Sequence, residues 1–160
     1  MIFLNNLSEK KIGVLGLGIT GFSIISSALR CGANVVCWDD DQKKRDEAEE
    51  KGYDLVDLNL ENELQTLDFL LVSPGIAHLY PDTHEILKSA YRLNIEVDND
   101  IGLFFSHYLS LDYDKFEREP KVIAITGSNG KSTVTALAGH VLSKIFNDVK
   151  TGGNIGNPVL

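Results

Sequence analysis

The sequence contains few of the features that mark secreted, membrane-spanning or metal-binding proteins. Among its 160 residues there are only two cysteines, Cys31 and Cys37, which lack metal-site spacing and are expected to be free thiols of a cytoplasmic protein. No apolar run approaches the roughly 20 residues needed to span a bilayer, and residues 1–11 show no secretory signal. The four histidines, at positions 78, 84, 107 and 140, are scattered and are expected to be ordinary surface or partly buried residues.

Basic residues are also fewer than acidic residues. Lys and Arg total 15 against 23 Asp and Glu, which gives a formal charge of −8. Because polyanions repel an acidic chain, non-specific binding to nucleic acid or to a membrane surface is not expected. Hydrophobic residues make up 43% of the chain and charged residues 24%, a balance typical of a globular protein with a sizeable core.

Short apolar runs alternate with helix-like stretches along the first two-thirds of the chain. Strands are predicted at 11–15, 34–38, 54–58, 68–72 and 94–97, and helices at 22–29, 42–51 and 83–93. Strands separated by helices favour repeated βαβ units, so we predict an α/β fold with a Rossmann-like, parallel five-stranded sheet covered on both faces. This first domain is expected to span residues 1–109. Residues 98–100 are interpreted as a solvated strand end rather than as a fragment of a metal loop.

The remaining residues have a different character. Residues 110–120 are polar and end in a proline, which predicts a linker. Strands are predicted at 121–126 and 149–151, with a helix between them whose apolar stripe is Val134, Leu137, Ala138, Val141, Leu142 and Ile145. Residues 121–160 hold only one βα unit and the beginning of another, so we expect them to be the truncated beginning of a P-loop-type α/β domain. Two strands and one helix rarely bury enough surface to be stable alone. From Val122 onward we expect less order than in the first domain, or stabilisation by a neighbouring chain. The stripe is expected to form either a core or an exposed adhesive face that permits self-association.

The first of two glycine loops is the segment Gly-Leu-Gly-Ile-Thr-Gly at residues 16–21, between a predicted strand and a predicted helix. Glycine permits a tight turn and lets main-chain amides approach a phosphate, while the helix N-terminus adds partial positive charge. Asp39 ends the second strand 18 residues after Gly21, where an acid can bind a ribose or a base edge. The pattern predicts a site for NAD, as in an oxidoreductase, or for another nucleotide. The alternative is a structural turn that binds nothing.

The second glycine loop is Thr126, Gly127, Ser128, Asn129, Gly130, Lys131, Ser132 and Thr133. Such a loop surrounds a polyphosphate with amide donors, its lysine reaches the β- and γ-phosphates, and a hydroxyl at Ser132 or Thr133 can ligate Mg²⁺. Ile125 stands where the standard P-loop has its first glycine, so this is a shorter variant or, alternatively, a coincidental turn. A dehydrogenase needs only the first loop and a simple ATPase only the second. An ATP-driven ligase with a nucleotide-linked substrate needs both.

The segment Ile-Thr-Gly-Ser-Asn-Gly-Lys-Ser-Thr at residues 125–133 resembles the ATP loop of the Mur ligases of peptidoglycan synthesis, and is also similar to that of folylpolyglutamate synthases. Together with residues 16–21, Ser23, residues 73–76 and residues 152–156, it resembles the D-glutamate-adding members of the Mur ligases. The resemblance extends from about Lys11 to Leu160, which is nearly the whole chain.

The resemblance implies a ligase that uses ATP and Mg²⁺ to join D-glutamate to UDP-N-acetylmuramoyl-L-alanine through an acyl-phosphate. It implies the following substrate contacts: Gly18, Ile19, Thr20 and Gly21 with the diphosphate, Asp39 and its neighbour Asp40 with the uracil, Ser73, Pro74 and Gly75 with the sugar, and Asn154 with the muramoyl part. It also implies ATP binding by residues 127–133, with Lys131 catalytic and Ser132 holding Mg²⁺.

The sequence departs from the family pattern in several places. Gly102 stands where the family often has a second acid, and Asp40 and Asp41 add negative charge near the diphosphate, an effect that solvent screening reduces. The family's downstream Mg²⁺-binding acid, modified lysine and D-glutamate domain have no counterparts here, so we expect this chain alone not to ligate. A noncatalytic nucleotide-binding remnant of a split or decayed gene is therefore a further alternative.

Overall fold

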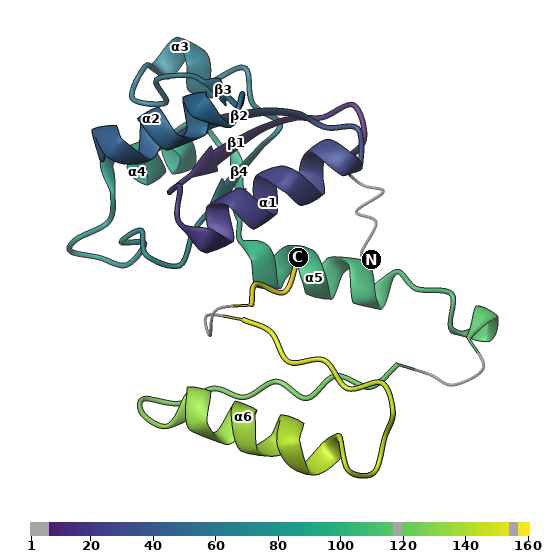
Figure 1. Cartoon of the computed structure of the whole chain (residues 1–160). Coiled ribbons are helices and arrows are strands. Elements are labelled where there is room, and N and C mark those ends of the chain that lie inside the picture. Colours follow the sequence, from purple (N-terminus) through teal and green to yellow (C-terminus); the bar gives the residue numbers. More distant parts are fainter. Residues whose placement is uncertain (1–6, 117–119, 154–156) are drawn as a thin grey trace.

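The computed structural model describes residues 7–116, 120–153 and 157–160, and it confirms the predicted α/β fold. Five parallel strands form one sheet in the order β3-β2-β1-β4-β5 (Figure 1). The strands are β1 Lys11–Leu15, β2 Asn34–Trp38, β3 Asp54–Leu55, β4 Phe69–Val72 and β5 Glu96–Asp98. Since β1 pairs with β2 on one side and with β4 on the other, it is the central strand.

Helices connect the strands and continue beyond the last of them. They are α1 Ile19–Arg30, α2 Gln42–Glu50, α3 Glu61–Leu64, α4 Glu85–Arg92, α5 Asp100–Leu109, the 3₁₀ helix η2 Tyr113–Lys115 and α6 Lys131–Leu142. Side-chain caps mark the start of three of these helices, with Asp41 before α2, His84 before α4 and Asn99 before α5. No side chain caps the start of α1.

Residues from the central strands enter two separate cores, one on each face of the sheet. Ile12 and Val14 belong to the core that is covered by α1, α2 and α5, whereas Leu15 belongs to the core covered by α3 and α4. This split follows from the alternation of side chains along a strand. Full burial of a side chain of this size contributes about 1.5–3 kcal/mol, so covering both faces contributes strongly to stability.

The structure confirms the five strand positions and corrects one interpretation. β3 is shorter than predicted, β5 begins and ends later than the predicted 94–97, and α3 and α5 were not predicted. Residues 98–100 are not a solvated strand end: β5 ends at Asp98, Asn99 Oδ1 accepts a hydrogen bond from Gly102 N at 2.9 Å and so caps α5, and Asp100 is only 3% exposed. A cap at Asn99 satisfies an amide that a strand end would leave to solvent.

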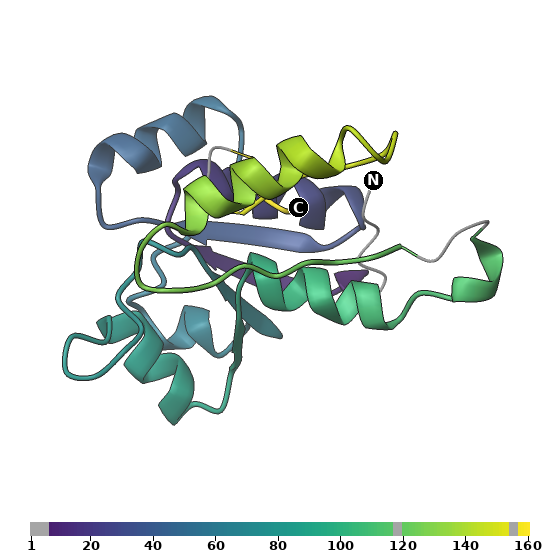
Figure 2. The same ribbon diagram turned by 90° about the horizontal axis from the view of Figure 1, so that it is seen from below.

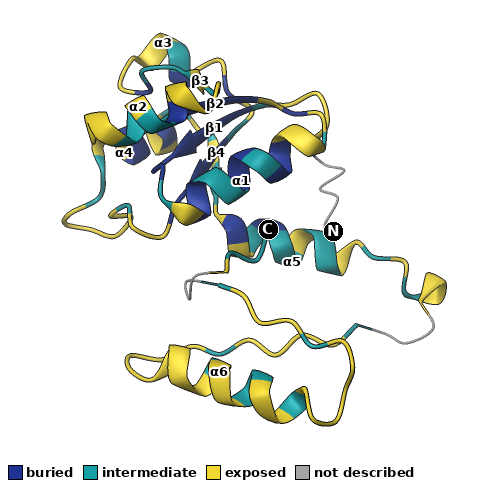
Figure 3. Cartoon of the chain, viewed as in Figure 1, coloured by how far each residue is buried: buried dark blue, intermediate teal, exposed yellow. Residues whose placement is uncertain are grey.

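In the second part of the chain the helix forms but the predicted strands do not. Neither 121–126 nor 149–151 is assigned as a strand, because a strand requires ladder hydrogen bonds to a neighbour and neither segment joins a ladder. No residue of α6 is buried, and Val134, Leu137 and Val141 are 52%, 61% and 49% exposed (Figure 3). The apolar stripe therefore forms an exposed face. Seen from below, α6 lies in front of the sheet (Figure 2).

Hydrogen bonds connect the first part of the chain to described residues beyond position 119. Tyr108 Oη donates to the Pro120 carbonyl at 2.9 Å, and Ser23 Oγ donates to the Leu160 carbonyl. The Leu160 side chain packs against the core beneath α1. The division into domains at 109 and 120 stays a prediction. In the part of the chain that is described, no helix is long and apolar enough to cross a bilayer.

Asp68 joins the beginnings of β1 and β4, and replacing it is expected to destabilise the sheet in a pH-dependent way. Its carboxylate accepts a hydrogen bond from Lys11 N at 2.8 Å, which holds the pKa of Asp68 below its ordinary value, with Lys10 Nζ at 3.4 Å adding to the effect. A lowered pKa stabilises the folded state above the ordinary range of an aspartate, and this stabilisation is lost as the pH falls through the folded value. Asp68→Asn should therefore melt below the wild type at pH 7 and approach it below about pH 4.

The measurement is Tm against pH, with Asp82→Asn as the control. Asp82 lies in an exposed loop, so its replacement should leave Tm unchanged at both pH values. A gap between Asp68→Asn and the wild type that stays constant from pH 7 to pH 3 would contradict the assignment.

Candidate functional site

Most of the predicted site residues lie at the edge of the sheet where β1, β2 and β4 end. The loop after β1 leads through Gly16 and Gly18 into α1, residues 39–41 follow β2, and Ser73 follows β4. Because α1 packs on one face of the sheet and α4 on the other, the connections after β1 and β4 diverge at this edge. In doubly wound sheets this divergence creates the crevice in which ligands bind.

The loop after β1 has the properties of an anion site. The first turn of α1 has neither a side-chain cap nor an acidic residue. The first amides of any helix lack intrahelical acceptors and carry the positive end of the helix dipole, and here no capping side chain accepts from them. A Cβ atom placed on Gly18 would meet no atom within 4 Å, so the space beside the loop is open. Gly18, Ile19, Thr20 and Gly21, the residues predicted to hold a diphosphate, are thus at a helix N-terminus that suits one.

A very close approach of backbone to backbone holds this loop in place. Gly16 has φ = +94°, a left-handed conformation that glycine adopts readily. A Cβ on Gly21 would lie 1.9 Å from the Gly16 carbonyl oxygen, and that oxygen also accepts a hydrogen bond from Ser73 Oγ at 2.6 Å. The Ser73 hydroxyl is buried and supports the loop, whereas Pro74 and Gly75 are exposed next to it. Contact of these three residues with a sugar stays a prediction.

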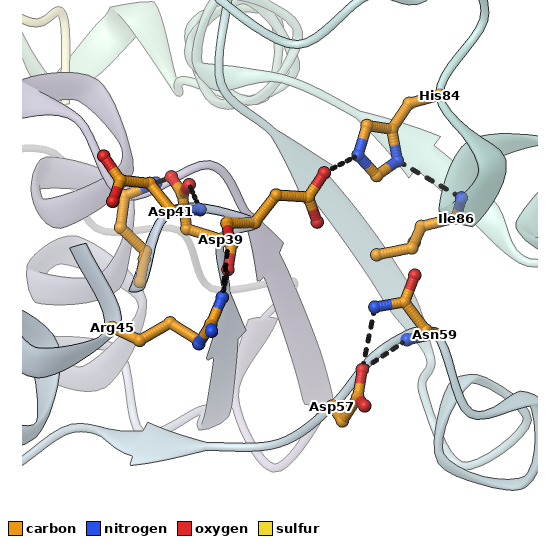
Figure 4. Close-up of polar contacts among 9 residues, drawn as sticks. Asp39, Asp41, Arg45, Asp57, Asn59, His84 and Ile86 are labelled. Atoms are coloured by element: carbon orange, nitrogen blue, oxygen red, sulfur yellow. Dashed lines mark hydrogen bonds and ion pairs between the residues drawn. The ribbon is translucent and has the colours of Figure 1, made fainter. Parts of the chain in front are cut away.

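Asp39, Asp40 and Asp41, called the acidic turn below, each have a hydrogen-bond donor for the carboxylate (Figure 4). Asp39 accepts from Leu17 N at 2.7 Å and from Asp41 N at 2.9 Å, and Asp41 accepts from Lys43 N at 2.9 Å. These bonds compensate part of the negative charge that the sequence places near the loop after β1. A carboxylate has about four lone-pair sites, so Asp39 can still accept a bond from a ligand.

Arg45 secures the backbone of the acidic turn, a role that was not predicted from the sequence. Its Nη1 donates to the carbonyl oxygens of Asp39 at 2.6 Å and Asp40 at 2.9 Å, and its guanidinium lies 4.6 Å from the centroid of the Trp38 ring. A basic residue in a charged helix gives no sign of such a role.

Like that of Arg45, the role of His84 at this edge of the sheet was not predicted from the sequence. Its Nε2 lies 2.8 Å from Asp40 Oδ2, and its Nδ1 accepts from Ile86 N at 3.2 Å (Figure 4). The available signal was its position just before Glu85 at the start of a predicted helix, where a capping side chain is expected. The partner 44 residues earlier could not be seen in the sequence.

The second glycine loop is formed, and its lysine bonds back to the loop. Gly130 has φ = +77° and precedes α6, and Lys131 Nζ donates to the carbonyl oxygens of Gly127 at 2.5 Å and Ser128 at 3.3 Å. The residues that follow, Ser132 and Thr133, are exposed. Among the described residues, no hydrogen bond joins this loop to the loop after β1. Asn154 lies outside the described residues.

The other candidate groups are buried or isolated. Within the ranges that the structure covers, no three His, Cys, Asp or Glu side chains lie where they could share a metal ion. Neither Cys31 nor Cys37 forms a disulfide, and burial, with a contribution from the Asp54 charge, raises the pKa of Cys37 to about 11. Burial also raises the pKa of Asp100 above its ordinary value, although the amides of Ile101 and Asp100 oppose that shift.

Comparison with known proteins identifies sequence relatives of this chain. Residues 10–97 match the family described as Mur ligase MurD-like, N-terminal domain. Proteins named UDP-N-acetylmuramoylalanine–D-glutamate ligase are 41% identical in Cereibacter sphaeroides and in Ruegeria pomeroyi, and 42% identical in Dinoroseobacter shibae. Each match covers 100% of this chain and 34% of the relative, so the chain spans about a third of their length.

Among solved structures, shikimate dehydrogenase from Aquifex aeolicus matches with a TM-score of 0.48 and 17% identity, over 61% of this chain and 45% of the other. The fold assignment comes from the strand order and pairing of the chain itself.

Replacing Gly21 by alanine is expected to destabilise the chain, because the new methyl group would collide with the Gly16 carbonyl oxygen. Gly21 lies inside α1, where alanine has the better helix propensity by about 1 kcal/mol, so the two effects oppose each other. We expect the collision to prevail and the free energy of unfolding to fall by about 1–3 kcal/mol in urea denaturation.

Gly18→Ala is the matched control. Its φ of −84° suits alanine and its Cβ would meet open space, so its stability should stay within about 0.5 kcal/mol of the wild type. Equal stability of Gly21→Ala and Gly18→Ala would disprove the close-approach argument.

Proposed function

The chain belongs to the Mur ligase family through its MurD-like N-terminal domain, and we propose that it forms the nucleotide-binding part of a ligase that adds D-glutamate to UDP-N-acetylmuramoyl-L-alanine. The observation that supports the proposal best is the juxtaposition at the sheet edge: an uncapped helix N-terminus with open space at Gly18 lies next to the acidic turn. The relatives named for this activity are about three times as long as this chain, so the complete activity needs more residues than these.

In this proposal the diphosphate and the uracil of the substrate are bound by different groups of the protein. Main-chain amides at Gly18, Ile19, Thr20 and Gly21 receive the diphosphate, which the dipole of α1 attracts. Asp39 and Asp40 accept hydrogen bonds from the uracil, because carboxylates pair with the N–H donors that a base presents. Ser73, Pro74 and Gly75 lie toward the sugar, and Asn154 toward the muramoyl part.

The second glycine loop is proposed to bind ATP together with Mg²⁺. The residues fit such a ligand: Lys131 Nζ already bonds to two loop carbonyls, a position from which it can turn to a phosphate, and a Cβ on Gly130 would meet nothing within 4 Å. Among the hydroxyls of this loop, we assign that of Ser132 to Mg²⁺. Other ligands must come from the nucleotide, from water or from further residues.

The proposed chemistry is activation of a carboxylate. Bound ATP supplies the phosphoryl group that converts the substrate carboxylate to an acyl-phosphate, and the D-glutamate amine then displaces phosphate to form the amide. In this chain, Lys131 would neutralise charge on the transferring group, and the amides of residues 127–130 would hold the phosphates in place. The carboxylate to be activated belongs to the substrate held by the first loop.

The first test is a calorimetric titration of the chain with UDP-N-acetylmuramoyl-L-alanine and, separately, with NADH. We expect binding of the uridine compound and none of NADH. Gly18→Ala should weaken the binding of the uridine compound about tenfold or more, equivalent to about 1.4 kcal/mol, because its methyl group enters the space intended for the phosphates.

Ser106→Ala, on the exposed surface of α5, is the control for this titration and should bind as the wild type does. Binding of NADH with no binding of the uridine compound would instead indicate the dinucleotide site of an oxidoreductase.

The second test concerns Lys131. Lys131→Met should weaken the binding of Mg²⁺-ATP at least tenfold, because a charged hydrogen-bond donor contributes about 1.5–3 kcal/mol. Fluorescence titration with a labelled ATP analogue measures this, and Lys144→Met, an exposed lysine beyond α6, serves as the matched control. Equal affinity of the two variants would count against an ATP site at this loop.

A further inference from the structure

His84 is held at both nitrogens of its ring. Ile86 N donates to Nδ1 at 3.2 Å, so Nδ1 is an acceptor and carries no proton. In the neutral ring the proton is then on Nε2, which lies 2.8 Å from Asp40 Oδ2. The ring therefore joins the start of α4 to the acidic turn without needing a charge, and only 18% of its side chain is exposed.

The bond between His84 and Asp40 crosses the centre of the sheet edge. Asp40 follows β2, and His84 precedes α4 in the connection that follows β4. In the sheet, β1 lies between β2 and β4, and neighbouring strands are about 4.8 Å apart. The pair thus connects two segments on opposite sides of the strand that leads into the phosphate loop.

Asp40 depends on His84 for its orientation. Its backbone is secured, because Arg45 Nη1 donates to its carbonyl oxygen at 2.9 Å. Its side chain, however, is 65% exposed, and His84 is the side chain that pairs with its carboxylate among the described residues. An exposed carboxylate samples several rotamers unless a partner restricts it, and that restriction costs free energy if it has to occur on ligand binding.

We propose that His84 is a positioning residue of the nucleotide site: it orients the Asp40 carboxylate for the nucleoside and keeps the connections after β2 and β4 at a set separation. This role rests on the proposed function, since it requires that the uridine end of the substrate lies at the acidic turn. His84 itself need not touch the substrate. Its loss should weaken binding of the uridine compound about three- to tenfold, because the carboxylate must then be ordered by the ligand.

Two conservative variants separate the two ends of the ring. In His84→Asn the side-chain oxygen can still cap α4 as Nδ1 does, but the shorter side chain does not reach Asp40. In His84→Gln the amide group lies near the place of Nε2 and can donate to Asp40, but the cap is lost. We expect His84→Gln to keep the affinity of the wild type at a lower Tm, and His84→Asn to keep the Tm at three- to tenfold lower affinity.

The experiment measures Tm by thermal melting and affinity for UDP-N-acetylmuramoyl-L-alanine by calorimetry, for these variants and for His84→Asn combined with Asp40→Asn. The double variant should bind no more weakly than Asp40→Asn alone, since His84 acts through Asp40. If His84→Asn binds as tightly as the wild type, or if its effect adds fully to that of Asp40→Asn, the positioning role is refuted while the proposed function stands. If the wild type does not bind the uridine compound, the proposed function and this role are both overturned.

Discussion

The contact between the Gly16 carbonyl and the backbone of Gly21 is the constraint on which the loop after β1, the proposed nucleotide-binding loop, depends. It allows α1 to begin directly beside the end of β1, because no side chain separates the helix from the loop. The Ser73 hydroxyl bonds to the same carbonyl from the neighbouring strand connection. The position of the free amides of α1 is therefore set by backbone packing among strand ends, and a methyl group at position 21 is enough to disturb it.

The hydrogen bonds of the acidic turn explain how three carboxylates can lie beside the proposed phosphate-binding loop. Three adjacent carboxylates beside a helix N-terminus would oppose an anionic ligand if they were unpaired. Instead, Asp39 and Asp41 accept main-chain hydrogen bonds, and Asp40 pairs with His84. The bond from Leu17 N to Asp39 also joins the two segments, so the loop after β1 and the turn after β2 hold one another in place.

The two parts of the chain differ in what they bury. In the first part, both faces of a sheet are covered, and residues such as Ile24 in α1 and Leu87 in α4 are fully buried. In the second part, α6 exposes its apolar stripe, and the extended segments beside it join no ladder within residues 120–153. The loop before α6 nevertheless forms, because its turn depends on local backbone conformation at Gly127 and Gly130 rather than on a core.

Local patterns in the sequence were sufficient to predict much of the fold. The apolar runs at 11–15 and 34–38 coincide with β1 and β2, because strands buried on both faces show as continuous apolar segments. α5 was not predicted, because the mixed aromatic residues after its asparagine cap show no clear helical period of hydrophobic residues. Residues 121–126 were predicted as a strand from their apolar character, but a strand also needs a neighbouring strand to pair with. Both glycine loops were predicted from the sequence because their residues are adjacent in the chain.

The long-range pairs could be known only from the folded chain. His84 and Asp40 are 44 residues apart, and Ser73 is 57 residues from the Gly16 carbonyl to which it donates. Composition and periodicity describe which backbone forms and which face is buried, and these properties are local. Which side chains meet at the sheet edge depends on the strand order, which brings β2 and β4 to opposite sides of β1, and that order follows from packing of the whole sheet.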